Sequence, residues 1–216
     1  MSSKLIGIAA IVVLIVLTGV VLTRKPASVA SAIAVASPTP AVADNINPDS
    51  LSGIQTNAAP WPPETDHLKD RLQAIHLPAL SQEGTALHTH EHLDIFIHRQ
   101  HTPVPSGIGI NKTAGFISPI HTHDATGIIH VESPTIRDYT LGQFFDIWGV
   151  RLTAACIGGY CTDSANTLLV FVDGQFYSQN PRDLVLKAHQ EIVISFGTAK
   201  ELPLPIPNDY SFPPDY

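Results

Sequence analysis

The segment from Leu87 to Ile97 alternates between polar and apolar side chains, and this alternation constrains the fold more than any other feature of the chain. It reads LHTHEHLDIFI, with Leu93, Ile95 and Ile97 at every second position. Successive side chains of a β-strand point to opposite faces of its sheet, so these three residues share one face. The pattern therefore predicts a strand that buries an apolar face and presents a polar one.

The polar face of this predicted strand carries His88, His90 and His92. Eight of the eleven histidines of the chain fall between residues 88 and 130, and a second His-x-His pair, His121 and His123, lies in the phrase HTHD. A neutral imidazole is the commonest metal ligand, and an i, i+2 spacing on a strand holds two of them about 6 to 7 Å apart. We predict that the two segments form a metal site; a solvated polar strand face is the alternative.

The second His-x-His segment belongs to a predicted hairpin, SPIHTHDATGIIHVES, in which Asp124 and Gly127 fit the first and last positions of a type I turn. If these two residues pair, His121 lies opposite His130, and His123 shares their face. If Gly127 instead forms a left-handed bulge, the register slips by one residue and His130 turns away. In that case the ligands must come from HTHEH, and the sequence leaves the two registers open.

The predicted metal ligands are six histidines on these segments. They are His88, His90, His92, His121, His123 and His130. Carboxylates close to them in the sequence, able to act as a base or to orient a ligand, are Glu91, Asp94, Asp124 and Glu132. Imidazole suits zinc and copper(II), so zinc or copper(II) is the expected cofactor. The only methionine is Met1, which excludes a thioether-rich copper(I) site.

The N-terminal segment contains an apolar run of 18 residues without a charge, Leu5–Leu22. As a helix it would be about 27 Å long, just enough to span a bilayer. We therefore predict that residues 1–25 are a transmembrane anchor, which makes the protein a single-pass membrane protein. A cleaved signal peptide is the alternative, because Ala30 and Ala32 provide an A-x-A-like neighbourhood downstream.

Composition divides the remainder of the chain into three parts. Residues 26–63 are rich in Ala, Ser, Pro and Val and lack a sustained period, which is typical of a flexible spacer. Residues 64–201 are predicted to be a His-rich β domain with short helices. Residues 202–216 contain five prolines and are predicted to be an extended tail on the domain or on a partner.

Cys156 and Cys161 are the only cysteines and lie in the phrase CIGGYC. The two glycines between them allow the chain to turn back and bring the sulfur atoms together. This spacing predicts a disulfide, which would place the domain in an oxidising compartment outside the cytoplasm. Two reduced thiols in a loop, or one thiol acting as a soft metal ligand, are the alternatives.

Two helices and several further strands are expected in the domain. The phrase ETDHLKDRLQAIHL repeats apolar residues along one helical face, and YTLGQFFDIWG begins with a capping box of Thr140 and Gln143. Further strands are predicted at 150–155, 168–172 and 191–196, with a tight turn at Asp173 and Gly174. The predicted fold class is mainly β (α+β): a single compact, β-rich extracytoplasmic domain with one packed helix, preceded by one N-terminal transmembrane helix.

The second half of the domain resembles β-grasp domains. The resemblance is carried by LLVFVDGQ, by LVLKAHQEIVISFG and by the position of the helix that begins near residue 140, so it covers residues 140–197. It has no diagnostic motif, and it does not extend to the His-rich half. The resemblance implies a fold and no activity.

Charge and motifs limit the functions that remain. Beyond Pro26 there are nine Lys or Arg against nineteen Asp or Glu, which argues against a nucleic-acid partner. The patterns together favour a membrane-anchored extracytoplasmic protein that binds zinc or copper through strand histidines. One alternative is a metalloenzyme with a three-histidine site and an open position for water, although no standard catalytic motif is present. The other is a structural or partner-binding domain that binds no metal.

Overall fold

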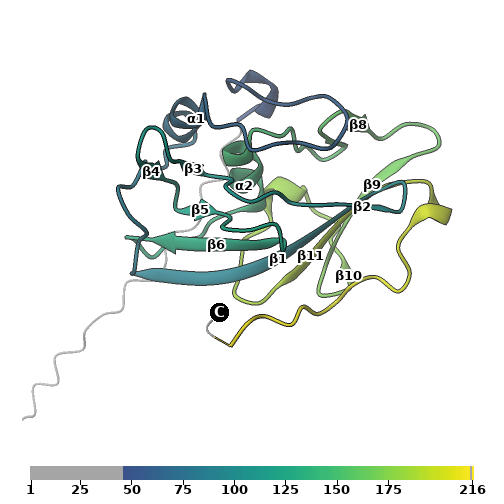
Figure 1. Ribbon diagram of the computed structural model, residues 1–216. Coiled ribbons are helices and arrows are strands. Elements are labelled where there is room, and N and C mark those ends of the chain that lie inside the picture. Colours follow the sequence, from purple (N-terminus) through teal and green to yellow (C-terminus); the bar gives the residue numbers. More distant parts are fainter. Residues whose placement is uncertain (1–45, 215) are drawn as a thin grey trace, which may run out of the picture. The chain divides into compact units, whose positions relative to one another are not determined.

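The computed structural model describes residues 46–214 and 216, and its main elements are two helices and a mixed sheet (Figure 1). The helices are α1 (Leu68–Ala74) and α2 (Leu141–Trp148), with short 3-10 helices η1 (Pro48–Ser50), η2 (Pro181–Asp183) and η3 (Ala199–Glu201). The strands are β1 (Leu87–Ile97), β2 (Gln100–Thr102), β3 (Ile110–Asn111), β4 (Phe116–Ile117), β5 (Ile120–His121), β6 (Ile128–Ser133), β7 (Cys156–Ile157), β8 (Tyr160–Cys161), β9 (Thr167–Val172), β10 (Gln175–Phe176) and β11 (Glu191–Gly197). The prediction of a β-rich α+β domain with one packed helix is confirmed.

The main sheet has the strand order β10-β9-β11-β1-β6-β5, and β2 pairs with the C-terminal end of β1. Its centre is the parallel pair of β1 and β11, whereas the other pairings are antiparallel. The first half of β1 pairs with β6 and the second half with β11, so β1 connects the two halves of the sheet. This long central strand is the segment whose alternation the sequence shows most clearly.

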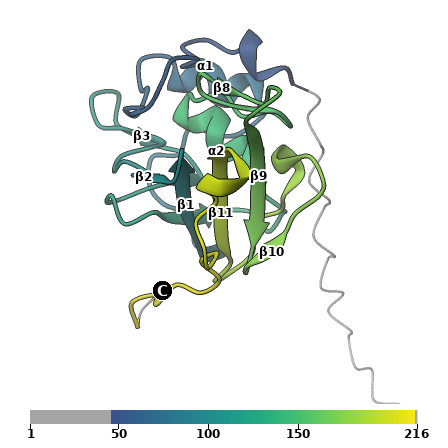
Figure 2. The ribbon, with the colours of Figure 1, turned by 90° about the vertical axis from the view of Figure 1, so that its right-hand side faces the viewer.

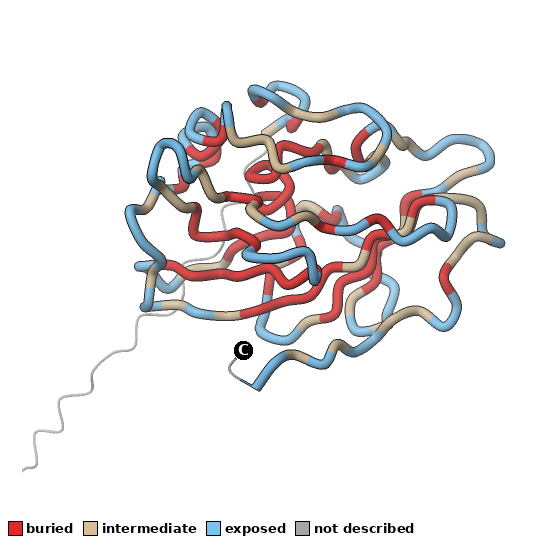
Figure 3. The backbone as a smooth tube through the Cα atoms, in the orientation of Figure 1, coloured by how far each residue is buried: buried red, intermediate tan, exposed pale blue. Residues whose placement is uncertain are grey.

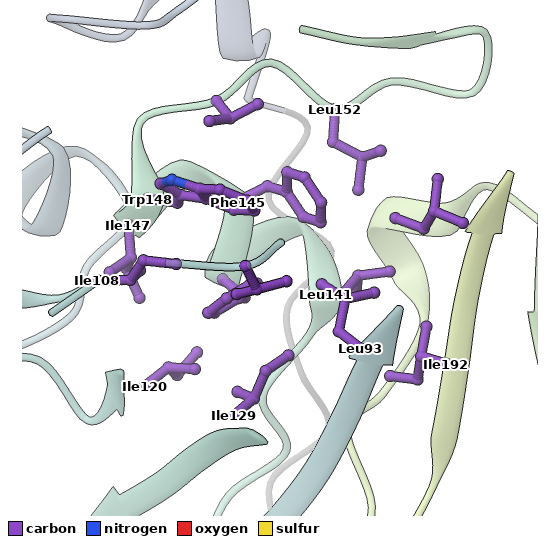
Figure 4. Packing of buried hydrophobic residues seen from close by; sticks show 14 of the residues in the cluster. Leu93, Ile108, Ile120, Ile129, Leu141, Phe145, Ile147, Trp148, Leu152 and Ile192 are labelled. Atoms are coloured by element: carbon purple, nitrogen blue, oxygen red, sulfur yellow. The ribbon is translucent and has the colours of Figure 1, made fainter. Parts of the chain in front are cut away.

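One face of the sheet packs against α2 and forms the core (Figure 4). Leu93 of β1, Ile129 of β6 and Ile192 of β11 are at most 1% exposed and lie on this face. From α2, Leu141 and Phe145 are fully buried in the same cluster. The predicted apolar face of residues 87–97 is therefore turned toward the helix, which leaves the histidines on the opposite face.

The opposite face of the sheet lies toward the C-terminal segment. Figure 1 shows α1 and α2 on one side of β1 and β6, and the segment that ends at residue 216 on the other. In Figure 2, after a quarter turn, the helices and the C-terminal segment again lie at opposite ends of the domain. The backbone of β1, β6 and β11 is mostly buried, whereas the C-terminal segment is mostly exposed or intermediate (Figure 3). The face of the sheet that carries the histidines is therefore turned toward this peripheral segment.

Helix α2 begins with the capping box that the sequence predicts. The Thr140 hydroxyl accepts a hydrogen bond from the Gln143 backbone amide at 3.3 Å, and the Gln143 side chain accepts one from the Thr140 amide at 3.2 Å. Gly149 ends the helix in the left-handed conformation, with φ of 79°. These caps fix the two ends of the helix that packs against the sheet.

Substitution of Thr140 by Ala should lower the free energy of unfolding by about 1 kcal/mol, because it removes the acceptor of the Gln143 amide. Chemical denaturation followed by circular dichroism measures this change. Thr113→Ala, at an exposed position in the turn between β3 and β4, is the control and should be nearly neutral. Equal effects of the two substitutions would contradict a stabilising role for the capping box.

The part of the predicted spacer that the structure describes, residues 46–63, packs on the domain. Trp61 is 2% exposed, and its ring lies edge-on to those of Trp148 and Tyr160 at centroid distances of 6.1 Å. The Trp61 indole also donates to the Asn57 carbonyl at 3.0 Å. For residues 46–63 the prediction of a flexible spacer is therefore wrong. Burial of the large Trp61 side chain holds this segment on the domain, although its composition is rich in Pro and Ala.

The predicted membrane anchor, residues 1–25, and the first part of the spacer lie outside the described residues. Among residues 46–214 and 216, neither helix has the length and hydropathy that a bilayer crossing requires. The membrane anchor therefore stays a prediction from the apolar run alone.

The cysteine segment forms a disulfide between Cys156 and Cys161, as the sequence predicts. The two residues face each other in the β7–β8 hairpin. Gly158 turns the chain there with φ of 52°, and a Cβ atom on it would lie 2.3 Å from the Trp61 ring. The predicted strand at 150–155 is not formed; Val150 and Leu152 make isolated bridges instead, because this stretch leads directly into the cysteine hairpin.

Candidate metal centre

Three strands bring histidines together on the face opposite α2. The antiparallel pairing of β1 and β6 places His90 directly opposite His130, and the pairing of β5 and β6 places His121 opposite His130. The three residues thus form a row across the sheet. This is the register in which Asp124 would pair with Gly127, so the first of the two predicted registers is the one observed.

Gly127 nevertheless has a positive φ of 93° without shifting this register. A Cβ atom at this position would lie 2.8 Å from the His92 Nε2 atom and 2.8 Å from the Leu93 carbonyl oxygen. The turn of the hairpin therefore folds back tightly against β1. Position 127 requires glycine both because its φ is positive and because a Cβ atom would collide with β1.

A first group of donors comprises His121, His123, His130 and Glu132. One ligand atom from each residue lies within 4.8 Å of the others. The His121 and His123 Nε2 atoms are 3.2 Å apart, and His130 Nδ1 is 3.4 Å from Glu132 Oε1. Ligands at zinc-like bond lengths of 2.0–2.1 Å in a tetrahedron are about 3.3 Å from one another. The two contact distances match the edges of such a site.

The orientation of two rings in this group favours metal ligation. His121 is fully buried, and its Nδ1 atom lies 3.0 Å from the Ser118 carbonyl oxygen, which can only accept a hydrogen bond. Nδ1 is therefore protonated, and the lone pair is left on Nε2. The Nδ1 atom of His130 is buried and makes no hydrogen bond of ordinary geometry among the described residues, although Glu132 Oε1 lies 3.4 Å from it. Buried polar atoms are almost always satisfied, so an unsatisfied imidazole nitrogen points to a missing ligand.

A second group comprises His88, His90 and the same Glu132. The Nε2 atoms of His88 and His90 are 3.1 Å apart, and His88 Nε2 is 3.2 Å from Glu132 Oε1. His90 is 5% exposed, whereas the His88 side chain is 54% exposed. The second group therefore extends the histidine row toward solvent. We refer to the five histidines of both groups, with Glu132, as the histidine face.

The buried rings of the histidine face are neutral at neutral pH. Burial, followed by the proximity of neighbouring histidines, lowers the pKa of His90 and of His121 to about 4. The same causes lower the pKa of His130 to about 3. A metal ion requires the neutral form of imidazole. These three rings can therefore accept a cation at pH 7 without first losing a proton.

Glu132 is the carboxylate common to both groups. It is 6% exposed, and burial, followed by the nearby carboxylate of Glu83, raises its pKa to about 7. Glu83 Oε1 also lies 3.4 Å from His123 Nε2. Two carboxylates beside several neutral imidazoles repel each other, and a bound cation would relieve that repulsion.

His92 does not join the other five predicted ligands. Its Nδ1 atom lies 2.7 Å from Glu191 Oε2, and its Nε2 atom lies 2.9 Å from the Thr126 carbonyl oxygen. Burial lowers the pKa of His92, but the hydrogen bond and charge of Glu191 outweigh it and raise the pKa above the usual value. A ligand atom of His92 is within 4.8 Å of Asp94 and Glu191. With both ring nitrogens already bonded, however, the geometry is that of an ion pair.

The C-terminal segment contacts the histidine face through aromatic rings. The Tyr216 ring lies 4.4 Å from the His90 ring and 5.3 Å from the His130 ring, between centroids. The Tyr210 ring stacks on His92 at 3.7 Å and 9°. His189 donates from its backbone amide to the His90 carbonyl at 2.7 Å. The Pro-rich segment and the loop before β11 therefore border the candidate metal centre.

Glu132 was predicted only as a neighbour of the ligands, and Glu83 and Glu191 were not predicted at all. Glu132 could have been found, since it stands two residues after His130 on a strand and so shares its face. Glu83 precedes β1 in a loop, and no periodic pattern places it. Glu191 meets His92 across a sequence separation of 99 residues, through the parallel pairing of β1 and β11. His189, in the loop before β11, is near His90 for the same reason.

Comparison with known proteins adds no relative: the chain matches no family model, no curated protein and no solved structure. The β-grasp resemblance of residues 140–197 therefore stays a prediction. What the structure provides is a β-rich domain with a disulfide and with His and Glu groups that can hold a metal ion.

Proposed function

We propose that this protein is a membrane-anchored, extracytoplasmic protein that binds zinc or copper(II). His121, His123 and His130 supply three imidazoles to the ion, and Glu132 supplies a carboxylate. The observation that carries the proposal is the convergence of four donors within 4.8 Å of one another, among them the buried Nδ1 atom of His130, which makes no hydrogen bond in the described part of the chain. Such a nitrogen is costly to bury unless it has a partner, and a cation provides one.

The donor set supports a transition metal over magnesium or calcium. Mg²⁺ and Ca²⁺ prefer oxygen ligands, six or more in number, whereas this centre offers mainly imidazole nitrogens. Contact distances of 3.2 and 3.4 Å fit a compact four-coordinate ion. Imidazole suits both zinc and copper(II), so the proposal includes both.

Two features support the proposed location. The disulfide of Cys156 and Cys161 is typical of proteins that fold in an oxidising compartment. The charge-free run Leu5–Leu22 is long enough for one transmembrane helix. An anchored domain outside the cytoplasm accommodates both features.

A metalloenzyme is the second candidate, and one observation favours it. A surface cavity of about 470 Å³ is lined by residues 81–83 and by residues of the β3–β4 hairpin, and Glu83 belongs to its wall. Because Glu83 Oε1 lies 3.4 Å from His123, a molecule in this cavity would be close to the bound ion. Three imidazoles could hold a zinc ion whose fourth position is left to water, and Glu132 could then accept a proton from that water. A hydrolytic assay of the zinc-loaded protein with ester and phosphoester substrates tests this.

Equilibrium dialysis of the full chain tests the proposed function. Protein stripped with a chelator is dialysed against Zn²⁺, Cu²⁺ or Mg²⁺, and the bound metal is measured by elemental analysis. We expect at least one equivalent of Zn²⁺ or Cu²⁺, a raised melting temperature and no retained Mg²⁺. Metal-free protein with an unchanged melting temperature would overturn the proposal and favour a partner-binding domain.

A further inference from the structure

The donors on the histidine face exceed what one ion can use. Together with Glu132, His121, His123 and His130 already offer four ligand atoms within 4.8 Å of one another. His88 and His90 converge on the same carboxylate, and their Nε2 atoms are 3.1 Å apart. A tetrahedral ion takes four ligands. Five imidazoles in two converging groups are therefore enough to ligate two cations.

Glu132 lies where a bridging ligand would be required. Its Oε1 atom is 3.2 Å from His88 Nε2 in the second group and 3.4 Å from His130 Nδ1 in the first. The residue is 6% exposed, so the carboxylate is held between the two groups and not free to swing into solvent. A carboxylate has two oxygens and about four lone-pair sites, so it can ligate an ion on each side.

We propose that the histidine face is a two-metal centre, in which Glu132 bridges two zinc-class divalent cations. His121, His123 and His130 hold the first ion, and His88 and His90 hold the second. Two-metal sites in proteins place their ions about 3.5 to 4 Å apart, a separation that one bridging carboxylate can span. This inference rests on the proposed function, since it requires the first ion to bind.

The two ions should bind in order. The first has three imidazoles, of which His121 and His130 are at most 4% exposed. The second has only three protein donors, one of which, His88, is 54% exposed. It also experiences the charge of the first ion, which Glu132 and the nearby Glu83 offset in part. The second ion is therefore the weaker one, with a coordination position open to water or to an oxygen of a small ligand.

Metal stoichiometry of the full chain in Zn²⁺ tests the proposal. We expect two equivalents for the wild type at saturation and one for His88→Asn. His101→Asn is a matched control that should retain two: the His101 side chain is also 54% exposed, and its Nε2 atom also faces a carboxylate, Asp94 Oδ1, at 3.1 Å. Because both substituted side chains are half exposed, neither substitution should disturb folding, which circular dichroism checks.

Titration with Co²⁺ provides a second readout. The first equivalent should give the spectrum of an isolated ion, and the second should give a magnetically coupled pair, as a shared carboxylate requires. One equivalent in the wild type, or two uncoupled equivalents that His88→Asn leaves unchanged, would overturn the two-metal centre while the proposed function stands. No bound metal at all would instead overturn the proposed function.

Discussion

His121→Ala is expected to lower the affinity for Zn²⁺ at least 100-fold. His121 Nε2 is a donor of the first group, and its ring is fixed by the Ser118 carbonyl at 3.0 Å. A structural zinc ion with four ligands binds with about 10 to 16 kcal/mol, so each ligand contributes about 3 kcal/mol, which corresponds to roughly 100-fold in affinity. Competition with a chromophoric chelator measures the change on the full chain.

The position of His121 makes this test specific. The residue is fully buried, so solvent-exposed side chains cannot easily take its place as a ligand. His67→Ala is the control, because His67 lies before α1 with its side chain 50% exposed and should leave the affinity unchanged. The melting temperature of the metal-free variant separates loss of the ligand from loss of packing. A folded His121→Ala variant with wild-type affinity would exclude the first group as the metal site.

Glu91→Gln is expected to stabilise the metal-free protein at pH 7 by about 3 kcal/mol. Glu91 is fully buried on the core side of β1, and neither of its carboxyl oxygens makes a hydrogen bond of ordinary geometry in the described part of the chain. Burial raises its pKa from 4.5 to about 8, against an opposing effect of the Thr89 hydroxyl. At pH 7 the folded protein therefore keeps a proton at Glu91 that the unfolded chain releases. Keeping it lowers the free energy of unfolding by about 1.4 kcal/mol for each pH unit above 4.5.

The sign of this effect follows from proton linkage. Between pH 4.5 and about 8 the folded state binds one more proton at Glu91 than the unfolded state, so stability falls as pH rises through this range. Glutamine is neutral in both states and removes this slope. The difference between variant and wild type should therefore be small near pH 4 and grow up to pH 8. Urea denaturation at several pH values, with chelator present, measures it.

Glu201→Gln provides a control of opposite sign. The backbone amide of Thr198, followed by the His98 side chain, lowers the pKa of Glu201 to about 2. An acid with a lowered pKa stabilises the folded state above its unfolded pKa, so removing it should reduce stability at neutral pH. If Glu91→Gln instead destabilised the protein at pH 8, the Glu91 carboxylate would have a partner that favours its charged form.

Local sequence signals predicted the elements that local interactions determine. The alternation in 87–97 predicted β1 and its two faces, and Thr140 with Gln143 predicted the start of α2. The Asp173–Gly174 turn was also predicted and joins β9 to β10. In each case the residues that decide the structure lie within a few positions of one another, so the pattern is visible in one segment.

The candidate site was predicted only in part, because its assembly depends on register and on distant segments. The sequence left two registers open for the 121–130 hairpin, and packing of β6 between β1 and β5 selects the one that aligns His121 with His130. It did not predict the packing of Trp61 against Trp148. Nor did it predict that His92 would be paired with Glu191, because that contact exists only once β11 lies beside β1.

The pattern of residues along each segment was enough to predict clustered imidazoles on the polar face of strands, two cysteines close enough to bridge, and apolar stripes that must be buried. The folded sheet was needed to show which of those imidazoles meet, that Glu132 lies between two groups of them, and that His92 forms an ion pair with Glu191. The two kinds of information differ in their range along the chain. Side-chain periodicity is set by neighbouring residues along the chain, whereas ligand convergence is set by strand order and register, which depend on the packing of the whole sheet.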